Sequence, residues 1–187
     1  GIDLSVGSVI ALTGVVCAVL IERYHWHPLQ IFPLILVGAA CFGALMGALI
    51  HYYDLQPFIV TLAGMFCARG LATTISENST PINHPFYSAV SAFGFGVPGG
   101  GWVGSLTLML VPVLAGALLP AHYTRFGNNV YAIGGNRRDA ELMGVPVAAT
   151  TNGIYALSSG FAALAGIVFS FYTFSGYALA AMGVELD

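Results

Sequence analysis

Long apolar stretches that are almost free of charged residues dominate this sequence, and they restrict its possible folds more than any other feature. Hydrophobic residues make up 57% of the 187 residues, charged residues make up only 7%, and the mean hydropathy is +0.84. A water-soluble domain carries about 25% charged residues, because its surface must interact with water. The 5 basic and 8 acidic residues are too few to cover a soluble globule of this size. The sequence therefore predicts a protein embedded in lipid.

The apolar stretches have the length of membrane-spanning helices. About 20 apolar residues cross about 30 Å of hydrocarbon, because a helix rises about 1.5 Å per residue. The stretches are continuously apolar, which favours helices over the alternating strands of a membrane barrel. One stretch contains Arg69, which either reaches an interface or faces the protein interior. The predicted spans of this all-α polytopic membrane protein are Val6–Ile21, Leu29–Ile50, Pro57–Ile75, Trp102–Ala121 and Ala148–Tyr172.

The distribution of arginines predicts the orientation in the membrane. Arg125, Arg137 and Arg138 lie between the fourth and fifth predicted spans. Basic residues accumulate in cytoplasmic connections, so this connection is expected inside the cell. Arg23 in the first connection counts against the resulting alternation, but three arginines outweigh one. The expected inner connections are 51–56 and 124–147; the expected outer ones are 22–27 and the periplasmic loop 76–101, whose middle, 86–95, is expected to form a short helix on the membrane surface.

Several functional classes lack their sequence signatures. A net charge of −3 offers no concentration of basic residues for nucleic acid. There is no GxxxxGK[ST] phosphate loop, and no HExxH or GxSxG pattern of an intramembrane enzyme. Cys17, Cys41 and Cys67 lie singly in apolar runs and are interpreted as small buried hydrophobes. No metal site is predicted, because the weak pattern His25–His27 fits an interfacial belt of aromatic residues better.

The polar segment 124–146, TRFGNNVYAIGGNRRDAELMGVP, has the pattern of a short capped helix. Asn136 suits the position before a helix, where its side chain accepts from free backbone amides. Gly144 suits the position just past a helix end, where the backbone often adopts the left-handed conformation. Leu142 and Met143 give the element an apolar face. From these residues alone, the element is either a knob for the groove of a partner or a simple structured turn.

Four motifs in chain order decide between these alternatives. They are Gly1–Ser8 (GIDLSVGS), Pro57–Leu62 (PFIVTL) with Arg69–Gly70, Tyr131–Asn136 (YAIGGN) and Gly183–Asp187 (GVELD). Together they resemble the ABC-importer permeases that serve ribose, other monosaccharides and autoinducer-2. The resemblance implies a single transmembrane permease domain over 1–187, incomplete at both ends. It would be a fragment with about five transmembrane helices of a longer bundle in the bacterial inner membrane.

The resemblance also implies partners and roles. They are a cytoplasmic ABC ATPase that holds ATP and Mg, a second permease subunit, identical or related, and a periplasmic sugar-binding protein, besides membrane lipid. The chain itself is expected to bind no cofactor and to catalyse no reaction. The segment 124–147 would be the cytoplasmic coupling loop, and its expected ATPase contacts are Gly134, Gly135, Asn136, Arg137, Arg138, Asp139, Glu141, Leu142, Met143 and Gly144.

The expected function is monosaccharide import by alternating access. Within the family, Ile75–Pro85, Pro98–Gly101 and Thr124–Asn136 resemble the galactofuranose permeases, so galactofuranose is the expected sugar. The alternatives are another sugar, a secondary transporter or a structural membrane subunit. A secondary transporter gives no reason for the capped cytoplasmic element.

The substrate pathway is predicted from polar residues inside the spans, which are functional candidates by default. Serine and threonine also bond to their own helix backbone, which is the competing interpretation. Asp3 precedes a predicted helix, where capping is the simpler role. The pathway candidates are Asn152, Ser158, Ser159 and Thr61, with Thr150, Thr151, Ser8 and Thr13 as further polar residues in spans.

Overall fold

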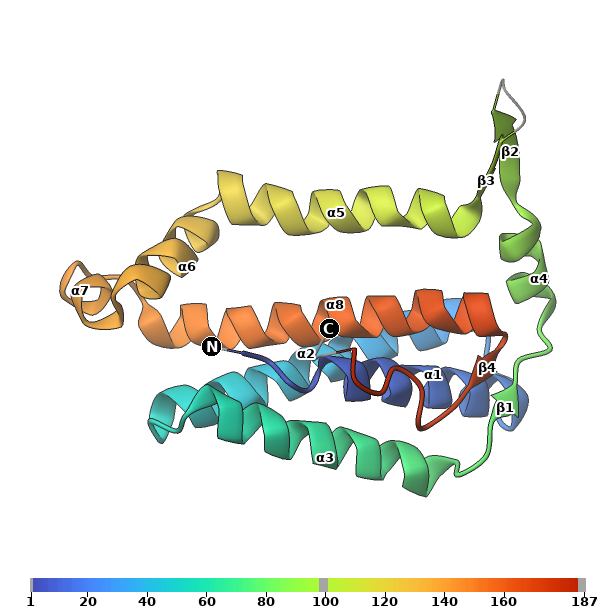
Figure 1. Ribbon diagram of the computed structural model, residues 1–187, viewed down its shortest axis with the longest axis horizontal. Helices are drawn as coiled ribbons and strands as arrows, with labels where there is room; N and C mark the ends of the chain where they lie inside the picture. Colours follow the sequence, from blue (N-terminus) through green and yellow to red (C-terminus); the bar gives the residue numbers. More distant parts are fainter. Residues whose placement is uncertain (1, 98–100, 185–187) are drawn as a thin grey trace.

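The protein is a bundle of long helices that run side by side (Figure 1). The computed structural model describes residues 2–97 and 101–184, so Gly1, Pro98–Gly100 and Glu185–Asp187 of the motifs above lie outside the described residues. The long helices are α1 (Val6–Glu22), α2 (Pro28–Tyr52), α3 (Pro57–Ile75), α5 (Ser105–Tyr123) and α8 (Val147–Thr173). All but α1, which has 17 residues, are long and apolar enough to cross a membrane. The predicted all-helical fold is confirmed, and the first predicted span is present as a shorter apolar helix.

Proline and histidine set the starts of several helices. Proline is the first residue of α2, α3 and α4 (Pro85–Ala92), where its fixed φ suits the helix and its missing N–H costs nothing. The ring Nδ1 of His27 accepts from the amide of Leu29, and that of His84 accepts from Phe86. These two histidines therefore act as helix caps at one end of the bundle.

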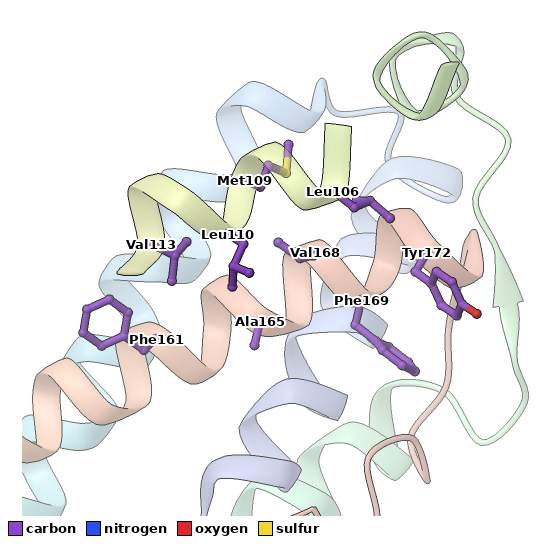
Figure 2. A pocket seen from close by; sticks show the side chains of 9 residues that line it. All are labelled: Leu106, Met109, Leu110, Val113, Phe161, Ala165, Val168, Phe169 and Tyr172. Carbon is purple, nitrogen blue, oxygen red and sulfur yellow. The ribbon is translucent and has the colours of Figure 1, made fainter. Parts of the chain in front are cut away.

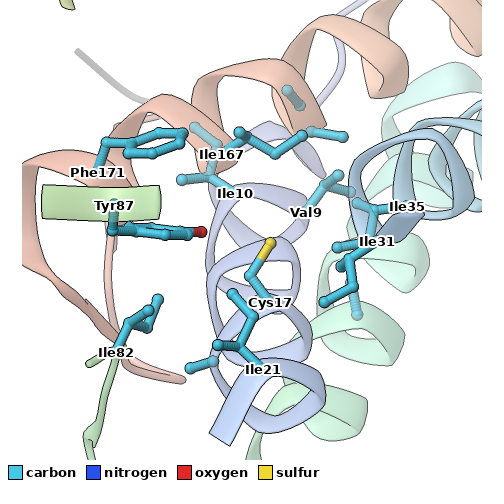
Figure 3. Packing of buried hydrophobic residues seen from close by; sticks show 14 residues of the cluster. Val9, Ile10, Cys17, Ile21, Ile31, Ile35, Ile82, Tyr87, Ile167 and Phe171 are labelled. Atoms are coloured by element: carbon cyan, nitrogen blue, oxygen red, sulfur yellow. The ribbon is translucent and has the colours of Figure 1, made fainter. Parts of the chain in front are cut away.

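Helix α1 lies at the centre of the bundle and is buried along most of its length. It contacts α2, α3 and α8, and Figure 3 shows Ile10 and Cys17 of α1 surrounded by isoleucines and Phe171 from other elements. Cys17 is buried as predicted, but Cys41 and Cys67 are exposed, which corrects the prediction for these two residues. They lie on helix faces that lack a protein neighbour within the described residues.

Glycines allow α2 and α8 to approach closely. A Cβ on Gly43 would overlap the carbonyl oxygen of Tyr155, and one on Gly47 would lie 2.7 Å from the Cα of Asn152. These glycines are four residues apart, and small residues at this spacing let helix backbones approach closely in lipid. The tight contact explains why α2 and α8 form the most extensive helix pair.

The connections group at the two ends as the predicted alternation requires. The turn between α2 and α3 lies at the same end as α6 (Arg125–Gly135) and α7 (Arg137–Leu142), called the α7 end (Figure 1). The connection between α1 and α2 lies at the opposite, α4 end, where Glu22 accepts from the amide of Asn83. The arginines predict that the α7 end faces the cytoplasm.

The α4 end contains two small sheets that the sequence analysis missed. Strand β1 (Thr80–Pro81) pairs antiparallel with β4 (Ser175–Gly176), and β2 (Gly94–Val97) pairs antiparallel with β3 (Gly101–Gly104). The predicted helix 86–95 is therefore shorter and ends at Ala92, and the predicted span that began at Trp102 begins only at Ser105. Trp102 belongs to β3, because the glycine-rich sequence from Gly94 to Gly104 favours paired strands over a continuous helix.

Tyr87 fixes α4 on the bundle. Its ring stacks on Phe171 of α8 with 4.2 Å between centroids, and its hydroxyl lies 3.0 Å from the hydroxyl of Ser170. Burial raises the pKa of Tyr87 above the usual range, and the nearby Cys17 raises it further. The hydroxyl is therefore neutral at physiological pH and serves as a hydrogen-bonding group that holds α4 on α8.

Candidate functional site

The predicted capped helix is present as α7, and its first turn is built by Asn136. The backbone amides of Arg138 and Asp139 donate to Asn136 Oδ1 over 3.0 and 3.4 Å. This satisfies two of the amides that a helix start leaves free, and Asp139 adds favourable negative charge there. The preceding helix α6, which the sequence analysis did not predict, begins in the same way, with Thr124 Oγ1 accepting from Gly127.

The end of α7 also has the predicted geometry. Gly144 has a φ of +81°, a conformation that favours glycine because it lacks a Cβ. Its amide donates to the carbonyl of Glu141, and the amide of Val145 donates to that of Ala140, each over 3.0 Å. The two bonds close the helix and turn the chain toward α8.

Helix α7 is anchored on one side and open on the other. Ala140 is completely buried, whereas Leu142 and Met143 are 81% and 72% exposed. All ten residues predicted as ATPase contacts, Gly134–Arg138 with Asp139, Glu141, Leu142, Met143 and Gly144, are exposed. An apolar pair held on a capped helix is a surface suited to a partner rather than to water.

Arg137 joins this element to the turn between α2 and α3. Its Nη2 lies 3.0 Å from His51 Nδ1, and its Nη1 lies 4.0 Å from Asp54 Oδ1. The ion pair is exposed, so its contribution to stability is small. Its structural consequence is that α7 contacts the end of α2 and the turn to α3 as well as α8.

Two of the four predicted pathway residues meet the segment before α1, whereas Asn152 and Ser159 face α2. Thr61 Oγ1 donates to the carbonyl oxygen of Ile2 over 3.2 Å, and Ser158 contacts the next residue, Asp3. Thr61 Oγ1 also donates to the carbonyl of Pro57 over 2.9 Å, which is the backbone bonding named above as the competing interpretation. Asn152 and Ser159 lie against Gly47 and Gly43 of α2. Asn152 Oδ1 and Ser159 Oγ are buried and have no hydrogen-bond partner among the described residues.

Ser158, unlike Asn152 and Ser159, has a hydrogen-bond partner, because it bonds to Asp3. Its hydroxyl donates to Asp3 Oδ2 over 2.6 Å, while Asp3 Oδ1 accepts from the amide and the hydroxyl of Ser5. The prediction that Asp3 caps α1 is therefore wrong, because the residue before that helix is Ser5; Asp3 instead holds the turn before α1 and adds a bond to α8. Sequence reasoning missed this bond because 155 positions separate the two residues.

Arg69 faces the protein interior, which decides between the two predicted alternatives. Its Nη1 donates to the carbonyl oxygens of Ala178 and Ala180 over 2.9 and 2.8 Å. Both carbonyls belong to a non-helical segment that follows β4. Within residues 2–97 and 101–184, no three His, Cys, Asp or Glu side chains lie close enough together to hold a metal ion.

Comparison with known proteins identifies the family. The family model described as the permease component of branched-chain amino acid transport systems matches residues 1–187. The chain belongs to this permease family. Among the similar proteins, the inner membrane ABC transporter permease protein YjfF of Escherichia coli K12 is 54% identical over all 187 residues of this permease chain. The apolar helices and this similarity identify a part of a multi-pass inner membrane protein.

Two further relatives carry sugar names. The fructose import permease protein FruG of Bifidobacterium longum is 39% identical, and the ribose import permease protein RbsC of E. coli K12 is 34% identical, each over the whole permease chain. The chain covers 56% of YjfF and of FruG and 58% of RbsC, so it spans little more than half the length of these relatives. No solved structure matches the chain.

Proposed function

We propose that this chain forms the core of the membrane-spanning permease subunit of an ATP-driven monosaccharide importer, with galactofuranose as its sugar. Support for the sugar class comes from the names of the fructose and ribose import permeases among its relatives. The choice of galactofuranose rests on the resemblance of 75–85 and 124–136 to galactofuranose permeases. The third stretch of that resemblance, 98–101, is largely outside the described residues.

The exposed helix α7 is the observation that carries this proposal. Leu142 and Met143 would enter a groove of a cytoplasmic ATPase, and Arg138, Asp139 and Glu141 would set the charge pairing around them. Arg137 would have a second role, because it already contacts His51 and Asp54. The chain needs such a partner, since its sequence has no phosphate loop with which to hydrolyse ATP.

Transport would proceed by alternating access. A periplasmic binding protein would deliver the sugar at the α4 end, and closure of two ATPases on ATP and Mg would move α6 and α7. Two permease subunits, identical or related, would enclose the pathway. Because α7 contacts both α8 and the turn between α2 and α3, its movement would tilt α2, α3 and α8 together.

ATP hydrolysis by the reconstituted transporter tests this proposal. The full-length permease is placed in liposomes with its ATPase, its second permease and the binding protein, and galactofuranose, ribose, fructose, allose and leucine are compared. We expect stimulation of hydrolysis, with uptake, by the binding protein loaded with galactofuranose. Stimulation by a different sugar would correct the substrate, and stimulation by leucine alone would reject the sugar class. No assembly with the ATPase would favour a secondary transporter or a structural subunit.

A further inference from the structure

A non-helical segment, residues 174–184, returns into the bundle at the α4 end. Figure 1 shows it running back beside α1 after β4. A Cβ on Gly176 would overlap the carbonyl oxygen of Gly14, so the segment crosses α1 in direct backbone contact. Ala178 is only 1% exposed and packs against Val15 and Val19. The segment is therefore packed into the bundle through Gly176 and Ala178, while Tyr177, Leu179 and Met182 stay exposed.

Arg69 makes this position of the segment possible. It lies six residues before Ile75, the last residue of α3, which is about 9 Å along the helix. At such depth, irregular backbone is tolerated only where it is buried in protein or lines a cavity that admits water. The guanidinium satisfies the carbonyls of Ala178 and Ala180, and a charged side chain at membrane depth marks a functional region by default.

A cavity of about 300 Å³ that is open at the surface lies between this segment and the end of α8. Its wall combines hydroxyl groups with aromatic rings, and it is lined by Ser79, Phe169, Thr173, Ser175, Tyr177 and Ala180. The hydroxyl of Thr173 is occupied by backbone carbonyls, which leaves the other hydroxyls for a ligand. This volume is at the small end of the range for ligand sites, and a few hydroxyls on an apolar wall are typical of such sites.

The larger cavities have a different chemistry. One of them, of about 410 Å³, lies between α5 and α8. Its lining side chains, shown in Figure 2, are apolar except for the hydroxyl of Tyr172. A neighbouring cavity of about 560 Å³ between α2, α4, α5 and α8 has an entirely apolar lining. A sugar needs hydrogen-bonding partners for its hydroxyl groups, because a buried polar group without one is costly. Those cavities therefore do not suit a sugar.

We propose that the cavity lined by Ser175 and Tyr177 binds a monosaccharide at the periplasmic entrance of the pathway, an inference that rests on the proposed function. The hydroxyls of Ser79, Ser175 and Tyr177 bond to the sugar, and the rings of Phe169 and Tyr177 cover its apolar face. Arg69 is a positioning residue: it does not line the cavity, but it holds the segment that forms one wall.

The test compares two tyrosines at the same end of the molecule. Tyr177→Phe and Ser175→Ala each remove one cavity hydroxyl, and Tyr172→Phe is the matched control, because Tyr172 is exposed and lines a different cavity. The full-length transporter is reconstituted with its ATPase, second permease and binding protein loaded with galactofuranose. Sugar imported and ATP hydrolysed are measured together. We expect Tyr177→Phe and Ser175→Ala each to lower the sugar imported per ATP about fivefold, the effect of one lost hydrogen bond, with unchanged stimulation of hydrolysis.

Each other outcome is decisive. An unchanged ratio in both cavity variants, or an equal decrease in Tyr172→Phe, overturns the site. Loss of stimulation in the cavity variants overturns it as well, because the hydroxyls would then serve docking of the binding protein. If the unsubstituted transporter shows no stimulation with any substrate of the panel, the proposed function itself fails and the inference falls with it.

Discussion

The carboxylate of Asp3 accepts a hydrogen bond of 2.6 Å from the hydroxyl of Ser158, and this bond ties the start of α1 to α8. A hydrogen bond to a charged group contributes about 1.5–3 kcal/mol, more than one between neutral groups. On its other oxygen, Asp3 holds the first turn before α1 through Ser5. The central helix is thus fixed at its start by one side chain that serves two elements.

Ser158→Ala should lower the free energy of unfolding by about 1.5–3 kcal/mol, because it removes this charge-assisted bond. Ser159→Ala is the matched control: the next residue on the same helix has a buried hydroxyl without a partner among the described residues, so its loss should cost little. Denaturant titration of the purified full-length permease in detergent measures both. Equal losses in the two variants would show that the bond to Asp3 adds no stability.

Gly144→Val should uncouple ATP hydrolysis from uptake while the protein still inserts and assembles. The φ of +81° is strained for a β-branched residue, so the end of α7 must change its direction. Gly38→Val is the control, because Gly38 lies in α2 and a Cβ there meets nothing within 4 Å. Uptake and hydrolysis are measured in liposomes. Normal uptake by Gly144→Val would contradict a role of this turn in coupling.

The helices were predictable because the properties that form them are local. Span length and continuous apolarity defined α2, α3 and α8 to within a few residues. The side chain of Asn136 and the positive φ of Gly144 defined the ends of α7, and both effects are local. The hairpin of β2 and β3 was missed because its residues are as apolar as those of a span. The signal that was available is the repeated glycine from Gly94 to Gly104.

The long-range contacts were not predictable in the same way. Arg69 and Ala178 are 109 positions apart, and nothing local indicates that a carbonyl of the chain, rather than a carboxylate or the membrane interface, receives the guanidinium. Likewise, the contacts of Asn152 and Ser159 with glycines of α2 follow from how two helices cross. Polarity within a span therefore identified residues that need a partner but not the partner itself.

Leu142→Ser and Met143→Ser should weaken assembly with the ATPase without changing the stability of the permease. Both side chains are largely exposed, so their replacement removes little packing within the chain. Burial of a large apolar side chain contributes about 1.5–3 kcal/mol, so the double variant should bind the ATPase at least tenfold more weakly. Tyr123→Ser, at the end of α5 and 84% exposed, is the control. Co-purification over a range of ATPase concentrations gives the affinities, and an unchanged affinity in the double variant would exclude α7 as the docking element.

Arg69→Met should release the returning segment from the bundle. Methionine is unbranched like arginine but has no charge and no donor, so the carbonyls of Ala178 and Ala180 lose their hydrogen-bond partner. We expect the free segment to open more often toward water, because each buried acceptor without a partner costs about 1–3 kcal/mol. The reporter is Ala178→Cys, at a position only 1% exposed, in a permease whose native cysteines are replaced by alanine, and it is labelled with a membrane-impermeant maleimide. Labelling should be at least about tenfold faster with Arg69→Met, because one such carbonyl corresponds to about a factor of ten.

Arg23→Met, which removes an exposed arginine at the same end, should leave the rate unchanged. Equal labelling rates with and without Arg69 would mean that packing of Gly176 on Gly14 holds the segment without help from the guanidinium.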